Sequence, residues 1–242
     1  MIPSHPAPDM HHLLHGDFTV EGQFMWGSNY TLLANIQNNG HTLKAVYKPT
    51  RGERPLWDFP SESLAGREVA AFLVSQALGW DLVPPTVFRP DGPAGPGSLQ
   101  LFIDHDPQQH YFSFTAGQRA RLRPVALFDA LINNTDRKGG HIILDFDEKF
   151  WLIDHGICFH AEPKLRTVIW DFAGQAISSG ARRDIADLRQ ALQPDGALAQ
   201  SLAAYLTPAE VAALRQRTAR LLTAGVFPSP TNGRYSYPWP PV

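Results

Sequence analysis

The sequence is short of several features that mark common protein classes. It has one cysteine, Cys158, so no internal disulfide can form and a reducing compartment, the cytoplasm, is expected. No run approaches the roughly eighteen apolar residues of a membrane span, and the first residues lack the basic and apolar pattern of a secretory signal. The formal net charge of -2 gives no reason to expect a nucleic acid or an acidic membrane as partner.

Motifs of two hydrolase classes are also lacking. Three histidines, His141, His155 and His160, suggest metal-dependent hydrolysis, but no His-Glu-x-x-His or other closely spaced ligand pair occurs. No Gly-x-Ser-x-Gly motif is found, and Cys158 lies in an apolar run with no base at a known position. Both chemistries are therefore disfavoured, and a buried structural role is expected for Cys158.

The order of the remaining patterns predicts the domain organisation. Residues 1–15 are rich in proline and histidine and predict a flexible tail, with metal binding as a weaker alternative. Residues 16–104 read mainly as strands with one helix, and residues 105–228 read mainly as helices around a hairpin. The proline-rich stretch 229–242 predicts a second tail. A β-rich half followed by an α-rich half favours an α+β fold with two lobes.

Individual elements follow from periodicity and punctuation. Strand patterns fill residues 17–47, and Pro49 ends them because proline cannot donate to a sheet. Residues 64–78 carry a helical apolar stripe that ends at Gly79, and residues 99–103 predict one more strand.

The second half opens with Pro124 in the first turn of a helix and ends with Thr207 and Glu210 in capping-box spacing around Pro208. The predicted late helices cover residues 181–192, 195–206 and 208–223.

The stretch "NNTDRKGGHIILDFDEKFWLIDHGICFH" predicts a β-hairpin bracketed by acidic loops. If Phe146 pairs with Lys149 at the turn, the register places His141 opposite Asp154, with Cβ atoms about 4.5–5.5 Å apart. Asp136 lies five residues before His141. Two carboxylates at the open end of a hairpin suit phosphoryl transfer, in which one holds a metal and the other orients the attacking hydroxyl. Taken singly, each aspartate also fits a turn or a strand end.

Phosphoryl transfer further requires a lysine on the phosphates, positioned by a glutamate. Lys48 ends a predicted strand, and Glu68 lies early in the next helix, at the edge of its buried stripe. An exposed strand end and a favourable charge near a helix N-terminus are the alternatives. The order along the chain favours a phosphoryl-transfer site: a turn comes first, then the strand lysine, the helix glutamate and the two aspartates.

The chain resembles the atypical kinases of the phosphatidylinositol 3-/4-kinase-like type. More narrowly, it resembles small bacterial members with "YKPTRGERPLWDFP", "LAGREVAAFLVSQALGWDLVPPT" and "DALINNTDRKGGHIILD", over roughly residues 16–228. Type II phosphatidylinositol 4-kinases and HipA-like kinases share only core pieces. The resemblance implies a two-lobed protein-kinase-like fold with ATP and Mg²⁺ or Mn²⁺ as cofactors.

It also implies roles for single residues. Lys48 contacts phosphates and is held by Glu68, while Asp136 is the catalytic aspartate. Asp154 binds metal, and His141 stands where these kinases carry a metal-binding asparagine. Gly27 and Ser28 cover the phosphates, and the adenine-reading hinge includes Gln100, Phe102 and Ile103.

The histidine at position 141 leaves the activity open. Imidazole suits softer ions than Mg²⁺, so His141 favours manganese, contacts phosphate or marks a pseudokinase that binds nucleotide with little transfer. An AMP transferase using the same site is a further alternative. The acceptor is a hydroxyl of an unidentified lipid, protein or small molecule.

Overall fold

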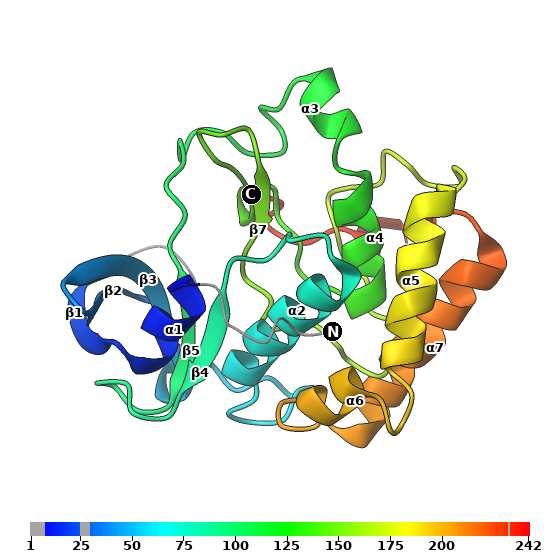
Figure 1. Cartoon of the computed structure of the whole chain (residues 1–242). Helices are drawn as coiled ribbons and strands as arrows, with labels where there is room; N and C mark the ends of the chain where they lie inside the picture. The colour runs from blue at the N-terminus through cyan, green and yellow to red at the C-terminus, as the bar shows by residue number, and fades with distance from the viewer. Residues whose placement is uncertain (1–7, 25–29, 232) are drawn as a thin grey trace.

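The computed structural model describes residues 8–24, 30–231 and 233–242 and shows an α+β protein (Figure 1). A five-stranded antiparallel sheet lies on one side, and most of the helices lie on the other. The strand order is β1-β2-β3-β5-β4. The strands are β1 (Asp17–Gln23), β2 (Leu32–Asn38), β3 (His41–Pro49), β4 (Thr86–Arg89) and β5 (Gly97–Leu101).

Local sequence explains the central strands. Asn39 and Gly40 join β2 to β3 with φ values of 49° and 79°, the conformation that a two-residue hairpin turn needs and that Asn-Gly favours. β3 ends at Pro49, as predicted. β5 then pairs with β3 on one side and β4 on the other. The short strand β4, next to a proline pair, was not predicted.

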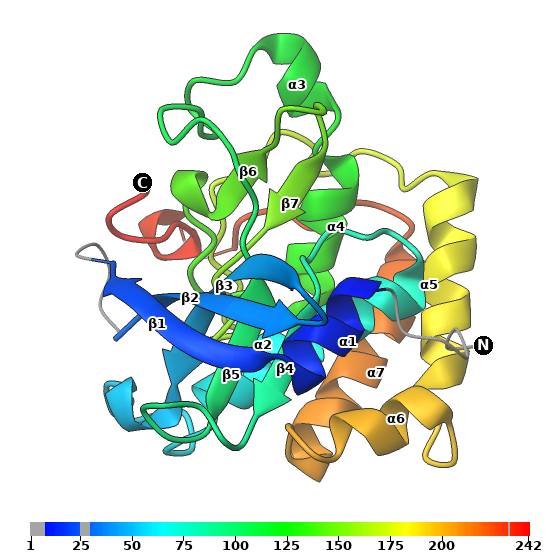
Figure 2. The same ribbon diagram turned by 60° about the vertical axis from the view of Figure 1, so that its left-hand side comes forward.

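Apart from the first helix, which packs against the sheet, the other elements fill the second side of the molecule (Figure 2). The helices are α1 (Pro8–His15), α2 (Leu64–Leu78), α3 (Ala116–Ala120), α4 (Arg123–Ile132), α5 (Ser179–Ala191), α6 (Ala197–Leu202) and α7 (Pro208–Ala224). A small antiparallel hairpin joins β6 (Ile142–Leu144) to β7 (Phe150–Leu152). Short 3-10 turns cover Thr50–Gly52, Gly139–His141 and Gly233–Ser236. No described helix combines the length and apolarity needed to cross a membrane.

Helix α2 links the two sides. It packs against β4 and β5 of the sheet and against α5 and α6, and both views place it between them (Figures 1 and 2). Its buried residues are distributed around the helix, as expected of an element enclosed by protein. Its bounds match the predicted helix, and Gly79 ends it with a φ of 66°. The larger apolar core includes α2, whereas a smaller core lies between the sheet and α1.

The capping box predicted for the last helix is present. The Glu210 amide donates to Thr207 Oγ1 at 3.3 Å, and the Thr207 amide donates to Glu210 Oε2 at 2.9 Å. Pro208 occupies the first helical position. This pattern is local, so its outcome depends little on the rest of the fold.

The described part of the predicted flexible tail is a helix, and the predicted second tail, at the other end, packs on the domain. Residues 8–15 form α1, whose Leu13 is fully buried in the sheet core and whose carbonyl accepts from Arg89 Nη1 at 2.9 Å. At the other end, Ser236 is 3% exposed. Its carbonyl accepts from the Thr167 amide at 3.1 Å. Both segments therefore pack on the domain, because each buries residues that composition alone did not reveal.

Candidate functional site

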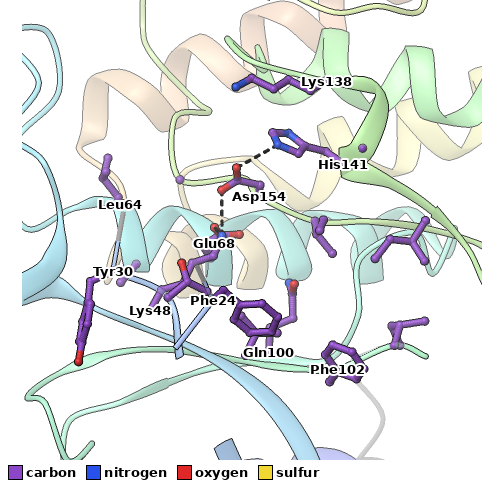
Figure 3. A pocket seen from close by; sticks show the side chains of 18 of the residues that line it. Phe24, Tyr30, Lys48, Leu64, Glu68, Gln100, Phe102, Lys138, His141 and Asp154 are labelled. Carbon is purple, nitrogen blue, oxygen red and sulfur yellow. Dashed lines mark hydrogen bonds and ion pairs between the residues drawn. The ribbon is translucent and has the colours of Figure 1, made fainter. Parts of the chain in front are cut away.

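A cavity of about 750 Å³ opens between β3, β5, the first half of α2 and the β6–β7 hairpin (Figure 3). Apolar side chains from the sheet and the hairpin form much of its wall, including Val46, Leu101, Ile143 and Ile153. Polar side chains gather at one side of it, namely Lys48, Glu68, His141 and Asp154. A largely apolar cavity with a few convergent polar groups is typical of a ligand site.

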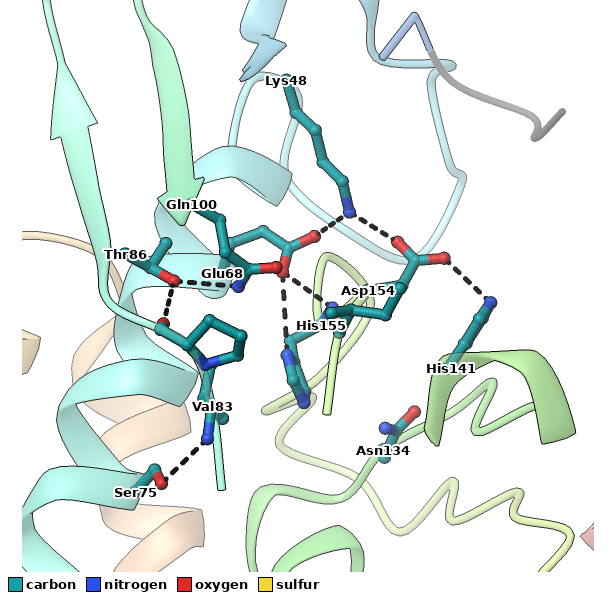
Figure 4. A network of polar contacts seen from close by, with 12 residues as sticks. Lys48, Glu68, Ser75, Val83, Thr86, Gln100, Asn134, His141, Asp154 and His155 are labelled. Atoms are coloured by element: carbon teal, nitrogen blue, oxygen red, sulfur yellow. Dashed lines mark hydrogen bonds and ion pairs between the residues drawn. The ribbon is translucent and has the colours of Figure 1, made fainter. Parts of the chain in front are cut away.

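Lys48 joins the polar groups from the sheet side. Its Nζ lies 2.5 Å from Glu68 Oε1 and 2.9 Å from Asp154 Oδ1, so one ammonium bridges two carboxylates (Figure 4). Burial disfavours the ammonium, but Asp154 and Glu68 outweigh it and raise the pKa of Lys48 above its ordinary value. Lys48 therefore stays charged at any physiological pH.

Glu68 holds this ammonium from α2. Its side chain is 3% exposed, and its second oxygen accepts from the His155 amide at 2.9 Å. Burial opposes ionisation, but Lys48 and the contact with His155 outweigh it, and the pKa of Glu68 falls to about 2. The structure thus places Lys48 and Glu68 in direct contact, as their predicted roles require.

Asp154 follows the hairpin and faces the cavity. Its backbone is left-handed, with a φ of 62°, which aspartate tolerates better than most residues. The side chain is 47% exposed; Oδ1 contacts Lys48, and Oδ2 lies 3.2 Å from His141 Nε2. Lys48 is the main cause that holds the pKa of Asp154 well below its usual range, although burial opposes the shift. This carboxylate is ionised and partly open to a ligand.

The predicted register of the hairpin is wrong by one residue. Ile142 pairs with Leu152 and Leu144 with Phe150, so facing residue numbers sum to 294. The cause is the turn, which spans three residues and places Glu148 at a φ of 62°. The predicted register, with Phe146 paired to Lys149, requires a two-residue turn.

The predicted neighbours nevertheless meet. His141 lies in a 3-10 turn, and its carbonyl accepts from the Ile153 amide at 3.1 Å, so Ile153 is its partner. Asp154 is the residue that follows this partner, and the side chains of His141 and Asp154 still make contact.

His141 is neutral near pH 7. Burial lowers its pKa to about 4 despite the opposing effect of Asp154. Its Nδ1 atom is buried and has no hydrogen-bond partner among the described residues. Among the described residues, the polar contact of the ring is therefore the one between Nε2 and Asp154 Oδ2.

Asp136 lies beside the cavity, on the loop that follows α4. Its amide donates to Asn134 Oδ1 at 2.9 Å, which fixes the loop, and its Oδ2 is 3.5 Å from Lys138 Nζ. Burial, followed by repulsion from Asp154, raises the pKa of Asp136 to about 6, against the effect of Lys138. Asp136 does not line the cavity in the described part of the chain, whereas Lys138 does.

The predicted hinge residues line the cavity as a group. Gln100 lies on β5, and its Nε2 donates to Thr86 Oγ1 at 2.8 Å. Phe102 and Ile103 follow the end of β5, and the Phe102 amide donates to the Lys44 carbonyl at 3.0 Å. Gly27 and Ser28 lie outside the described residues.

Sequence reasoning missed a buried charge network beneath the cavity. Asp129 and Arg137 are both fully buried, with Arg137 Nε 3.0 Å from Asp129 Oδ1. Arg137 also donates to the carbonyls of His141 and Ile153, at 3.1 and 2.9 Å, and its Nη2 lies 2.8 Å from His155 Nε2. One side chain therefore ties the Asp136 loop to the chain around Asp154.

A signal for this network was present in the sequence. Asp129 lies four residues after Val125 and three before Ile132, a spacing that puts the three side chains on one stripe of a helix. A carboxylate on such a stripe needs a buried cationic or hydrogen-bonding partner.

The histidines of the metal-hydrolase alternative are not gathered. His155 is buried and contacts Glu68, whereas the His160 ring packs edge-on against Phe59, with the ring centroids 5.3 Å apart. Within residues 8–24, 30–231 and 233–242, no three His, Cys, Asp or Glu side chains form a group able to hold a metal ion.

Together, fold and site define an α+β protein with a ligand-sized cavity at the junction of its sheet and helices. No known protein-family model matches the chain. It is 43% identical to Protein Rv2133c of Mycobacterium tuberculosis (strain ATCC 25618 / H37Rv), over 263 aligned positions covering 94% of this chain and 93% of the relative. The chain therefore belongs to the same family as Protein Rv2133c.

Proposed function

We propose that the protein is an ATP-dependent phosphotransferase related to the phosphatidylinositol 3-/4-kinase-like atypical kinases, acting on a hydroxyl acceptor. The observation that carries this proposal is the bridge from Lys48 to Glu68 and Asp154 at the cavity wall. In this interpretation the sheet and α2 form the first lobe of a protein-kinase-like fold, residues 105–228 form the second, and the cavity lies between them.

Lys48 supplies what a polyphosphate needs. Its ammonium is permanently charged and fixed by the buried Glu68, so it offers a preformed contact for phosphate oxygens. The cavity volume of about 750 Å³ lies within the range of about 300–1,000 Å³ that is usual for small-molecule sites. The apolar residues Val46, Leu101 and Ile143 would flank the base of the nucleotide.

The donor set fits a divalent cation that shares its ligands with phosphate. Glu68 and Asp154 carry two negative charges against the single positive charge of Lys48, and the exposed Asp154 oxygens face the cavity. Mg²⁺ commonly takes one or two carboxylates and completes its shell with water and phosphate oxygens. Asp154 and His141 would hold the ion, and the imidazole nitrogen favours Mn²⁺. When bound, the cation would offset charge on the transferred group.

Asp136 would orient the acceptor hydroxyl. With a pKa of about 6 it is mainly ionised at pH 7, yet near enough to that pH to exchange a proton. Its fixed loop and the contact with Lys138 keep the carboxylate beside the polar side of the cavity.

One observation favours a second candidate, a nucleotide-binding pseudokinase. His141 replaces the expected oxygen ligand, and its buried Nδ1 leaves the ring no way to present another donor. Weak binding of the second ion would permit nucleotide binding with little transfer. An AMP transferase would use the same residues on a different phosphate.

Labelled ATP separates these candidates. Transfer of label from γ-³²P-ATP indicates a kinase, transfer from α-³²P-ATP indicates AMP transfer, and thermal stabilisation by ATP with Mn²⁺ but no transfer indicates a pseudokinase. For a kinase, Asp136→Ala should lower turnover by roughly 10²–10⁴-fold while the Kd for ATP stays within about twofold. Asp147→Ala, in the exposed hairpin turn, is the control and should be silent. Normal turnover by Asp136→Ala would refute the catalytic assignment.

A further inference from the structure

Residues 239–242, here called the strap, form part of the cavity wall although they lie far in sequence from the other lining residues. Pro240 and Val242 line the cavity together with Lys138, Gly140 and His141. In Figure 2 the segment after α7 runs beside β6 and the turn that carries Gly139 to His141. The strap thus lies at the polar end of the cavity.

The base of the strap is firmly held. The Ser236 carbonyl accepts from the Thr167 amide at 3.1 Å and from Trp170 Nε1 at 3.3 Å. Ser236 is buried, and the Tyr237 ring packs edge-on against Trp170. This anchor fixes where the strap begins.

The strap itself is held more lightly. Its Pro241 carbonyl accepts from the Gly139 amide at 2.8 Å, but Trp239 is 89% exposed and Val242 is 55% exposed. Segments with little buried apolar surface open locally at low free-energy cost. Pro240 and Pro241 stiffen the strap, so docking costs little conformational entropy. These features suit a segment that docks and releases as a unit.

Gly139 connects the strap to the loop of Asp136. Its amide donates to Pro241, and its carbonyl accepts from the Tyr111 amide at 3.2 Å. A Cβ atom at this position would lie 3.0 Å from the Phe112 ring and 3.5 Å from the Pro241 carbonyl. Glycine at this position therefore leaves room for the Phe112 ring, and the hydrogen bond to Pro241 joins the strap to the loop directly beside Lys138.

We propose that the strap is a gate. Docked on Gly139, it closes the end of the cavity lined by Lys138 and His141; released, it opens that end. Combined with the proposed function, on which this step rests, the gate limits the size of the acceptor that reaches Asp136. Access to the cavity itself does not depend on which reaction occurs there.

Amide hydrogen exchange by NMR tests the gate in the full chain. The Gly139 amide bonds to the strap, whereas the Thr167 amide bonds to the anchor. We expect Gly139 to be at least tenfold less protected than Thr167. The double variant Pro240→Gly/Pro241→Gly should lower Gly139 protection severalfold further and leave Thr167 unchanged. Tyr235→Ala, exposed and upstream of the anchor, should change neither amide.

Probe access provides a second measurement. The association rate of 8-anilinonaphthalene-1-sulfonate should rise severalfold in the double variant and in a chain that ends at Pro238. Equal protection of Gly139 and Thr167, or unchanged association rates in the double variant, would overturn the gate. Absence of ATP binding together with low Gly139 protection would refute the proposed function and retain the gate. If transfer occurs, opening the strap should raise kcat/KM for bulky acceptors more than for small ones.

Discussion

Two ion pairs lie on either side of His155, and they differ in how far they are exposed to solvent. The lower pair, Asp129 and Arg137, is fully buried on both sides. The upper pair, Lys48 and Asp154, is 22% and 47% exposed. The lower pair is enclosed by protein, whereas both residues of the upper pair line the cavity.

Their hydrogen bonds explain the contrast. Asp129 also accepts from Asn134 and Thr167, and every nitrogen of the Arg137 guanidinium has a partner. A buried pair is tolerated when its remaining donors and acceptors are satisfied in this way. Asp154, in contrast, sits on a left-handed backbone beside a neutral His141. Backbone strain and perturbed charges concentrate at functional positions, and this contrast supports the proposed role of the upper pair in ligand binding.

The two pairs are connected. Arg137 contacts His155 Nε2, the His155 amide donates to Glu68, and Glu68 holds Lys48. The lower pair is thus a foundation for the upper pair, and substitutions in each can be ranked by their effect on the free energy of unfolding.

The largest loss is expected for Arg137→Met. It leaves the Asp129 carboxylate buried without its cation, which costs about 3–5 kcal/mol. Urea unfolding monitored by circular dichroism measures the change. Arg121→Met removes an ion pair that is 48% and 67% exposed, and it should cost about 1 kcal/mol or less. If Arg137→Met and Arg121→Met lowered the free energy of unfolding by similar amounts, burial would not distinguish the two kinds of ion pair.

The next loss belongs to Glu68→Gln and depends on pH. The pKa of Glu68 is lowered from its ordinary 4.5 to about 2, so the ionised side chain stabilises the fold above pH 4.5 and this contribution is lost as the pH falls toward 2. We expect the variant to lose about 3 kcal/mol at pH 7 and almost nothing near pH 2.

Glu148→Gln, at an exposed turn position, is the control and should show no such difference. A loss by Glu68→Gln that is constant over this pH range would mean that the side chain acts through packing and not through its charge.

Local patterns predicted much of this arrangement. The apolar stripe and Gly79 predicted α2, Pro49 predicted the end of β3, and the order of residues along the chain predicted that Lys48 and Glu68 share one site. For α2 and β3, neighbouring residues carry the information, so tertiary context changes little.

The features that sequence patterns did not predict mostly depend on contacts between residues far apart in the chain. α1 is a short helix stabilised by burial of Leu13 against strands far along the chain. The hairpin register depends on Glu148 adopting a positive φ, a conformation that glutamate seldom signals. The Arg137 network joins segments whose proximity only the fold reveals.

A gain in stability is expected for Asp136→Asn. The pKa of Asp136 is raised from its ordinary 3.8 to about 6, so the folded state prefers the protonated form and its stability falls as the pH rises through that interval. The neutral amide avoids this cost. The variant should be about 1–2 kcal/mol more stable than the natural protein at pH 8, with the difference vanishing below pH 4. A variant that is less stable at pH 8 would show that the contact with Lys138 outweighs burial.

The smallest change in unfolding free energy is expected for Asp154→Asn, because the side chain is half-exposed and asparagine also tolerates a left-handed backbone. The cost should be less than about 1 kcal/mol. The same variant should lose at least tenfold in Mn²⁺-dependent ATP affinity, measured by isothermal titration calorimetry. Asp145→Asn changes an aspartate whose oxygens bond to Trp151 and to the hairpin backbone, so it should leave this affinity intact. If Asp154→Asn strongly destabilised the fold and left the affinity for ATP unchanged, the upper pair would be structural, like the lower pair.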